Sequence, residues 1–282
     1  MLRSLRIVPP AFAALLAAAC GSGEGPAVPS IPAARTFQLA GFQPAGRVQP
    51  QKPVQIAFSI RQPSGETLTR YRRGSGPHTR IHLILVSDDL REIIHRHPPL
   101  PPDGRLAETV TFPRAARYRL VVDAYPDLPG TLRNFQLFRE IVVGRPGGNS
   151  GLPPFRATQT MAGFRVSVRS HPRLKAIEPA FFNVRVTRPD GTPPKVTPYF
   201  GALAHAIFFR AGTLDYFHTH VCGPGAVGCT TTFGGTTISG TATQPGLLRV
   251  GVLLPVPGSW RLFLQFRADG RIVTAPFTLK VT

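Results

Sequence analysis

The sequence predicts an all-β protein made of two tandem β-sandwich domains. The 282 residues include 31 prolines and 28 glycines, which favours turn-rich β structure over helical bundles. Short alternating apolar runs, about seven in each half, lie between these turns, and the mature chain shows no apolar run at helical spacing. An internal repeat is the third observation, and it indicates that one domain was duplicated.

The clearest part of the repeat is a stretch that contains three histidines. Residues 82–97 read HLILVSDDLREIIHRH, and residues 205–220 read HAIFFRAGTLDYFHTH. Each copy has one histidine, twelve further residues and then His-x-His, so the two copies hold six of the eight histidines. Few other positions agree, which argues against compositional bias. The repeat predicts a three-histidine cluster in each half.

The repeat continues on both sides of these stretches. Residues 53–63 (PVQIAFSIRQP) match 179–189 (PAFFNVRVTRP), and 113–123 (PRAARYRLVVD) match 255–265 (PVPGSWRLFLQ). With about seven short strands in each half, the pattern fits β-sandwiches of the immunoglobulin or cupredoxin type. The expected segments are 1–19 (signal peptide), 20–36 (tether), 37–144 (first sandwich), 145–152 (linker) and 153–282 (second sandwich).

The N-terminus reads as a targeting segment. Arg3 and Arg6 precede an apolar stretch that ends at Leu16, and three alanines lead to Cys20. This start resembles a bacterial lipoprotein signal, which implies that Cys20 is lipidated and becomes the first mature residue. The resemblance also implies a cell-envelope location, with Gly21 compatible with export away from the inner membrane. An ordinary secretory signal is the alternative.

The cysteines and the charge fit an exported protein. With Cys20 lipidated, Cys222 and Cys229 remain, and they flank a Gly-rich loop; we expect a disulfide there, with thiolate metal ligands as the alternative. The formal charge is +19, but the basic residues are scattered and no nucleic-acid motif accompanies them. We therefore expect no nucleic-acid partner and only a general attraction to an anionic envelope.

Both histidine stretches read as β-hairpins. A two-residue turn at Asp88-Asp89 would place His82 opposite His95, and the equivalent turn in the second copy would place His205 opposite His218. Alternate residues share a strand face, so His97 and His220 would join these sets. Both faces of each hairpin are apolar, so we expect the histidine face to be covered by the opposing sheet or by the other domain.

Three imidazoles on a rigid hairpin suit a divalent metal such as Cu²⁺ or Zn²⁺ and leave a coordination position open. The sequence therefore predicts one metal site in each repeat, with His78 as an additional candidate ligand of the first. The predicted ligands are His82, His95 and His97, and His205, His218 and His220. Purely structural histidines are the alternative, although opposed imidazoles repel when protonated.

The HRHP sequence at residues 95–98 resembles uncharacterised secreted or lipid-anchored bacterial proteins with tandem His...His-x-His-Pro sandwiches. The second copy departs from that pattern, with Val221 in place of proline. The resemblance implies envelope handling of heavy metals, with copper favoured. The expected partners are the membrane, through the N-terminal lipid, metal ions and another envelope protein.

Two further classes of function stay open at this stage. A metal-dependent oxidoreductase is one, because His-x-His also occurs in cupin and superoxide dismutase sites. However, neither pair is followed by the glutamate that cupins need, and no nucleophile pattern is evident, so the sequence assigns no catalytic residues. The other class is a non-catalytic adhesion or scaffold protein with structural histidines. The sequence does not distinguish storage, delivery and sensing of the metal.

Overall fold

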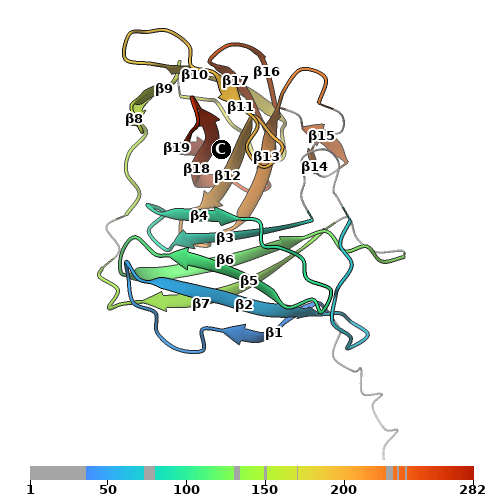
Figure 1. The fold of residues 1–282 in the computed structure, drawn as a ribbon. Coiled ribbons are helices and arrows are strands. Elements are labelled where there is room, and N and C mark those ends of the chain that lie inside the picture. Colours follow the sequence, from blue (N-terminus) through green and yellow to red (C-terminus); the bar gives the residue numbers. More distant parts are fainter. Residues whose placement is uncertain are drawn as a thin grey trace, which may run out of the picture. The chain divides into compact units, whose positions relative to one another are not determined.

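The computed structural model is all-β (Figure 1) and describes residues 36–72, 80–129, 134–148, 151–169, 171–226, 231–233, 235–238 and 240–282. The predicted signal peptide, His78, Cys20 and Cys229 lie outside these residues. Within them, no helix has the length and apolar character needed to span a membrane.

The first half forms two sheets with a shared core. The three-stranded sheet has the order β1-β2-β5 and the four-stranded sheet the order β4-β3-β6-β7. The core between them contains alternate residues of β3 and β6, such as Leu83 and Leu120, with Phe58 of β2. The strands are β1 (Gln38–Gln43), β2 (Pro53–Arg61), β3 (Ile81–Ser87), β4 (Ile93–Arg96), β5 (Leu106–Thr111), β6 (Ala116–Ala124) and β7 (Phe135–Val143).

The second half forms a longer ladder around its own core, which contains Trp260, Phe208 and Phe277. Its order is β11-β18-β12-β13-β16-β17-β10-β9-β8, with β19 paired to β18 and a separate β14–β15 hairpin. The strands are β8 (Thr158–Met161), β9 (Phe164–Val168), β10 (Ala180–Thr187), β11 (Val196–Thr197), β12 (Ala204–Arg210), β13 (Tyr216–Cys222), β14 (Thr231–Phe233), β15 (Thr236–Ile238), β16 (Gly240–Gln244), β17 (Leu247–Val252), β18 (Gly258–Ala268) and β19 (Arg271–Val281).

The predicted all-β sandwich class is thus confirmed. Strands pair only within each half among the described residues, but Thr36–Thr282 form one compact unit. The predicted domain boundaries therefore stay a prediction.

A third apolar cluster joins the two halves. Ile84, Val86 and Val121 of the first half pack with their repeat equivalents Ile207, Phe209 and Phe263 of the second. These residues are fully or almost fully buried. Four of them lie on the histidine face of the hairpins, and Val121 and Phe263 lie beside these on the neighbouring strands β6 and β18. The expectation that this face is covered is thus confirmed, and it is the other half of the chain that covers it.

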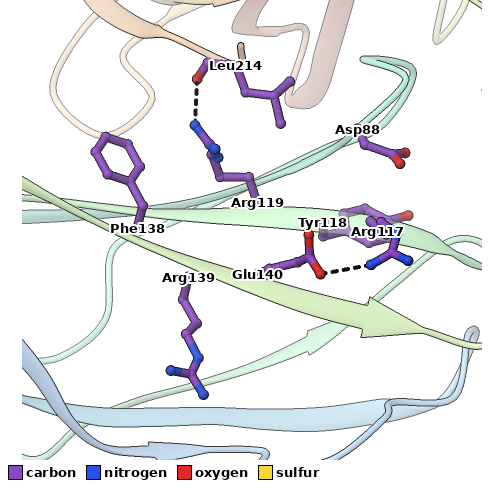
Figure 2. Close-up of a pocket in the computed structure, with 8 residues that line it drawn as sticks. All are labelled: Asp88, Arg117, Tyr118, Arg119, Phe138, Arg139, Glu140 and Leu214. Atoms are coloured by element: carbon purple, nitrogen blue, oxygen red, sulfur yellow. Dashed lines mark hydrogen bonds and ion pairs between the residues drawn. The ribbon is translucent and has the colours of Figure 1, made fainter. Parts of the chain in front are cut away.

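Polar contacts close one edge of this interface. Arg119 of β6 donates a hydrogen bond to the carbonyl oxygen of Thr213 at 3.0 Å. Its guanidinium also contacts the carbonyl oxygen of Leu214 (Figure 2). The adjacent pocket of about 270 Å³ is lined by residues of β6 and β7 together with Asp88 and Leu214, and its Arg117 is paired with Glu140 at 3.0 Å. None of the six predicted metal ligands lines it.

The hairpin register differs from the prediction by two residues in each copy. His95 pairs with Ile84 rather than with His82, and His205 pairs with His220 rather than with His218. The reason is that each loop has four residues and not two: Ser87 N bonds Glu92 O, and Arg210 N bonds Asp215 O. A shift by two keeps every side chain on its predicted face.

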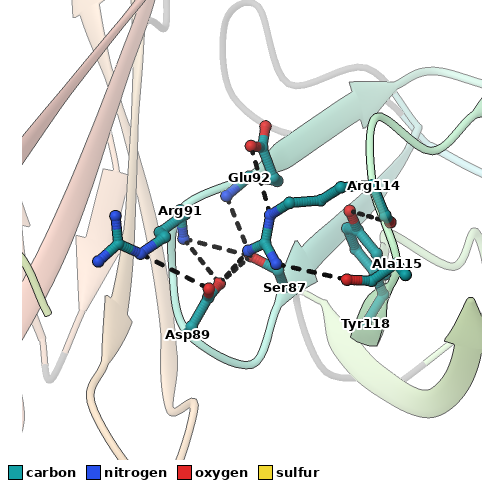
Figure 3. A network of polar contacts seen from close by, with 7 residues as sticks. All are labelled: Ser87, Asp89, Arg91, Glu92, Arg114, Ala115 and Tyr118. Carbon is teal, nitrogen blue, oxygen red and sulfur yellow. Dashed lines mark hydrogen bonds and ion pairs between the residues drawn. The ribbon is translucent and has the colours of Figure 1, made fainter. Parts of the chain in front are cut away.

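A polar network explains the longer first loop (Figure 3). The Ser87 hydroxyl donates to Asp89 at 2.7 Å and accepts the backbone amides of Arg91 and Glu92. The Arg114 guanidinium also binds the Asp89 carboxylate. Although burial raises the pKa of Asp89, the hydrogen bonds from Ser87 and Arg114 outweigh it and lower the pKa below its ordinary value. The network therefore holds an ionised carboxylate inside the loop.

Substitution of Asp89 tests this network. Asp89→Ala should lower the free energy of unfolding by about 1–3 kcal/mol, because buried donors lose their acceptor. Asp88→Ala in the same loop is the matched control and should cost less than about 0.5 kcal/mol. Urea unfolding followed by circular dichroism measures both, and equal losses would contradict the role of Asp89.

Candidate metal centre

The six predicted histidine ligands form one group and not two separate ones. We call them the six-histidine cluster: His82, His95, His97, His205, His218 and His220. All are buried except His97, which is half-buried. Rings from different halves lie close together, with centroids 4.9 Å apart for His82 and His218 and 5.0 Å apart for His95 and His205.

The cluster has approximate two-fold symmetry, since each ring distance matches that of the repeat-equivalent pair. The His82–His97 and His205–His220 centroids are 4.6 and 4.7 Å apart. The His82–His220 and His97–His205 centroids are both 6.1 Å apart. The two hairpins thus face one another as duplicated copies related by a pseudo-two-fold axis.

Among the described residues, two groups of three histidines have ring nitrogens within 4.8 Å of one another. The first is the predicted set of His82, His95 and His97. The second contains His82, and not His205, with His218 and His220. The second group therefore draws a residue from each half, which differs from the predicted arrangement of one self-contained site in each repeat.

Two nitrogen pairs have the separation expected of ligands to one ion. His95 Nε2 lies 3.0 Å from His97 Nε2, and His205 Nδ1 lies 3.2 Å from His218 Nε2. Nitrogens bound to one zinc ion at 2.0–2.1 Å are about 2.9–3.4 Å apart for angles between square and tetrahedral. The positions of these nitrogens thus suit shared coordination without large movement.

Oxygen acceptors orient two of the rings. Gln265, whose amide nitrogen donates to Thr274 at 3.0 Å, presents its oxygen to His95 Nδ1 at 3.2 Å. The Tyr199 carbonyl oxygen accepts from His205 Nε2 at 2.7 Å. Each bond places the proton on one nitrogen and directs the lone pair of the other into the cluster. Supporting bonds of this kind are usual around metal-binding histidines.

A buried acid lies beside the cluster. Asp123 is directly opposite His82 on the neighbouring strand and accepts hydrogen bonds from Asn134 at 2.8 Å and from the Tyr216 hydroxyl at 3.3 Å. Burial raises its pKa to about 6, against the opposing effect of these hydrogen bonds. Asp123 is therefore the carboxylate placed to balance positive charge near His82.

Sequence reasoning did not identify Gln265, Tyr199 or Asp123 as site residues. A signal for two of them was present, because Asp123 and Gln265 are the equivalent last residues of the matched stretches 113–123 and 255–265. Phe200 was also missed; its ring stacks on His97 with centroids 3.8 Å apart.

Burial favours the neutral form of two of the imidazoles, His95 and His218. The pKa values of His95 and His218 are lowered well below the ordinary range, first by desolvation and then by the neighbouring histidines. A neutral imidazole has a lone pair for a metal, whereas a protonated one has none. The disulfide between Cys222 and Cys229 stays a prediction, because Cys229 lies outside the described residues.

Comparison with known proteins assigns no function to this chain. A family described as "Domain of unknown function (DUF8832)" matches residues 159–282, less than half of the chain. No curated protein shows a significant match.

Among solved structures, the Escherichia coli adhesin FdeC is 11% identical with a TM-score of 0.27, over 88% of this chain and 65% of its own. Invasin, a bacterial integrin-binding protein, is 10% identical with a TM-score of 0.23, over 88% and 39%. Fibronectin(III)-like modules of Clostridium thermocellum CbhA are 10% identical with a TM-score of 0.22, over 87% and 93%. Likenesses this distant carry no argument about the fold or the function of this chain.

The lowered histidine pKa values predict acid sensitivity in the metal-free protein. Unfolded histidines gain protons below pH about 6.5 while native His95 and His218 do not, so stability falls as the pH drops. The expected loss is about 1 kcal/mol per histidine between pH 6.5 and 5.5. The measurement is urea unfolding with a chelator present, for the wild type and for His95→Gln.

The variant is needed because the pKa of Asp123 is raised to about 6 in the folded protein. Protonation of Asp123 therefore stabilises the folded protein as the pH falls below about 6, which opposes the effect of the histidines. Its contribution is common to both proteins and cancels in their difference. The free energy of unfolding of the wild type, minus that of His95→Gln, should therefore decrease as the pH falls. A difference that does not change with pH would contradict the neutral state of His95.

Proposed function

We propose that this protein is a membrane-anchored, extracytoplasmic metal-binding protein that holds Cu²⁺ or Zn²⁺ between its two hairpins. The observation that carries the proposal is the six-histidine cluster itself, in which ring nitrogens from the two halves lie within 4.8 Å of one another. Imidazole is a preferred ligand of both ions. Copper should bind more tightly than zinc by the usual order of stability.

A structural role accounts less well for the nitrogen geometry. A proton joins only two nitrogens, whereas a metal ion satisfies three or more lone pairs together. Protonated rings at these separations would also repel one another in a site from which water is excluded. The Gln265 and Tyr199 acceptors set the ring tautomers that coordination would require.

The location is inferred from the N-terminal sequence. Cys20 follows a basic and apolar start that resembles a lipoprotein signal, and residues 20–36 would form the tether. Lipidation would hold the protein at the membrane surface in the cell envelope. Its partners would then be membrane lipid, metal ions and an envelope protein that supplies or receives the metal.

Titration with metal tests the proposal directly. Cu²⁺ and Zn²⁺ are titrated calorimetrically into untagged, chelator-treated protein, and we expect at least one equivalent to bind with a dissociation constant below about 10 μM. The variants His95→Ala/His97→Ala and His218→Ala/His220→Ala should each lose affinity or stoichiometry while keeping the β-sheet circular dichroism spectrum.

His171 provides the matched control, because it is an exposed histidine outside the cluster. His171→Ala should bind metal like the wild type. The histidines are structural if the wild type binds neither ion with a dissociation constant below about 10 μM, or if the cluster variants bind as well as the wild type. Either result would favour the alternative of an adhesion or scaffold protein. Turnover of superoxide or a phenolic substrate by loaded protein would instead indicate an oxidoreductase.

The anchor is tested by Cys20→Ser. Loss of the thiol prevents lipidation, and the protein should move from the membrane fraction to the soluble fraction, because acyl chains provide the anchoring energy. Fractionation of cells that express the wild type and the variant measures this. A variant that stays fully in the membrane fraction would show that the attachment does not depend on Cys20.

A further inference from the structure

His82 has a position that no other member of the six-histidine cluster shares, since both groups of three nitrogens contain it. Its ring centroid lies 4.6 Å from that of His97 on its own hairpin and 4.9 Å from that of His218 on the other. Both of its ring nitrogens are buried. The side chain thus stands at the junction of two candidate sites.

An imidazole can serve two ions at once, because its two nitrogens lie on different edges of the ring. The two-fold mate of His82 is His205, whose Nε2 is already committed to the carbonyl oxygen of Tyr199 at 2.7 Å. His205 therefore has a single nitrogen, Nδ1, that faces the cluster. His205 belongs to neither group of three nitrogens, whereas His82 belongs to both, so His82 is the ring placed to join two sites.

We propose that the cluster binds two divalent ions and that His82 bridges them, with one ring nitrogen on each. This inference rests on the proposed metal-binding function. The first ion would be held by His82, His95 and His97, and the second by His82, His218 and His220. The two ions would be about 6 Å apart, from the width of the ring and metal–nitrogen distances near 2.0 Å.

Formation of the bridge changes the charge on His82. A bridging ring gives up its remaining N–H proton to the solvent when the second ion binds, so His82 becomes an imidazolate with one negative charge. Asp123, directly opposite His82, supplies a second negative charge when ionised. These two charges offset part of the repulsion between the ions, which the other, neutral histidines cannot do.

Copper provides a direct test, because two Cu²⁺ ions joined by an imidazolate couple their unpaired electrons. Untagged full-length protein is titrated with Cu²⁺ and followed by calorimetry and by electron paramagnetic resonance. We expect two equivalents to bind. The resonance intensity should rise up to one equivalent and then fall below that of two independent Cu²⁺ ions as the second equivalent binds.

His82→Ala should abolish this loss of intensity, whereas His171→Ala should keep it. If His82→Ala fails to fold, the wild-type titration alone still shows whether two bound ions are coupled through a bridge. Two equivalents with full, additive intensity would overturn the bridge, as would a single equivalent shared by both hairpins, and in both cases metal binding itself would stand. No binding at all would instead contradict the proposed function.

Discussion

The main constraint on this structure is the burial of imidazoles between two sheets, five of them almost fully removed from water and His97 half-buried. A buried polar ring is unfavourable unless its nitrogens find partners, and a buried charged ring is much more so. The apolar cluster at the same interface supplies the opposing contribution: Ile207, Phe209 and Phe263 are each almost fully buried, which stabilises by about 1.5–3 kcal/mol per side chain. The apolar part of the interface thus holds the histidines in an environment that they would not enter alone.

The sequence predicts much of this arrangement. The alternation of apolar residues identifies the hairpins, and parity alone assigns His82, His95 and His97 to one face. The register was wrong by two residues, because the length of the first loop depends on how Ser87 and Asp89 bind backbone amides, and such contacts have no periodic signal. A shift by an even number of residues keeps each side chain on the same face of the strand. The predicted face of the histidines is therefore correct, although the predicted cross-strand pairs are not.

The joining of two predicted clusters into one has a different cause. Nothing in the spacing of histidines within one repeat says which residue of the other repeat they meet, since that depends on how two finished sheets pack. Apolar residues on both faces indicated a covering layer but not its identity. The contribution of Gln265 to the site depends on this packing, because its oxygen accepts a hydrogen bond from His95 across the interface.

The pseudo-two-fold packing is what a symmetric dimer would show if its subunits were joined in one chain. Two separate subunits would come apart on dilution, whereas covalently joined halves meet at an effective concentration that does not depend on protein concentration. Joined copies are also free to diverge, which identical subunits are not. The equivalent positions Asp123 and Gln265 already differ, so the chain presents an acid to one side of the cluster and an amide to the other.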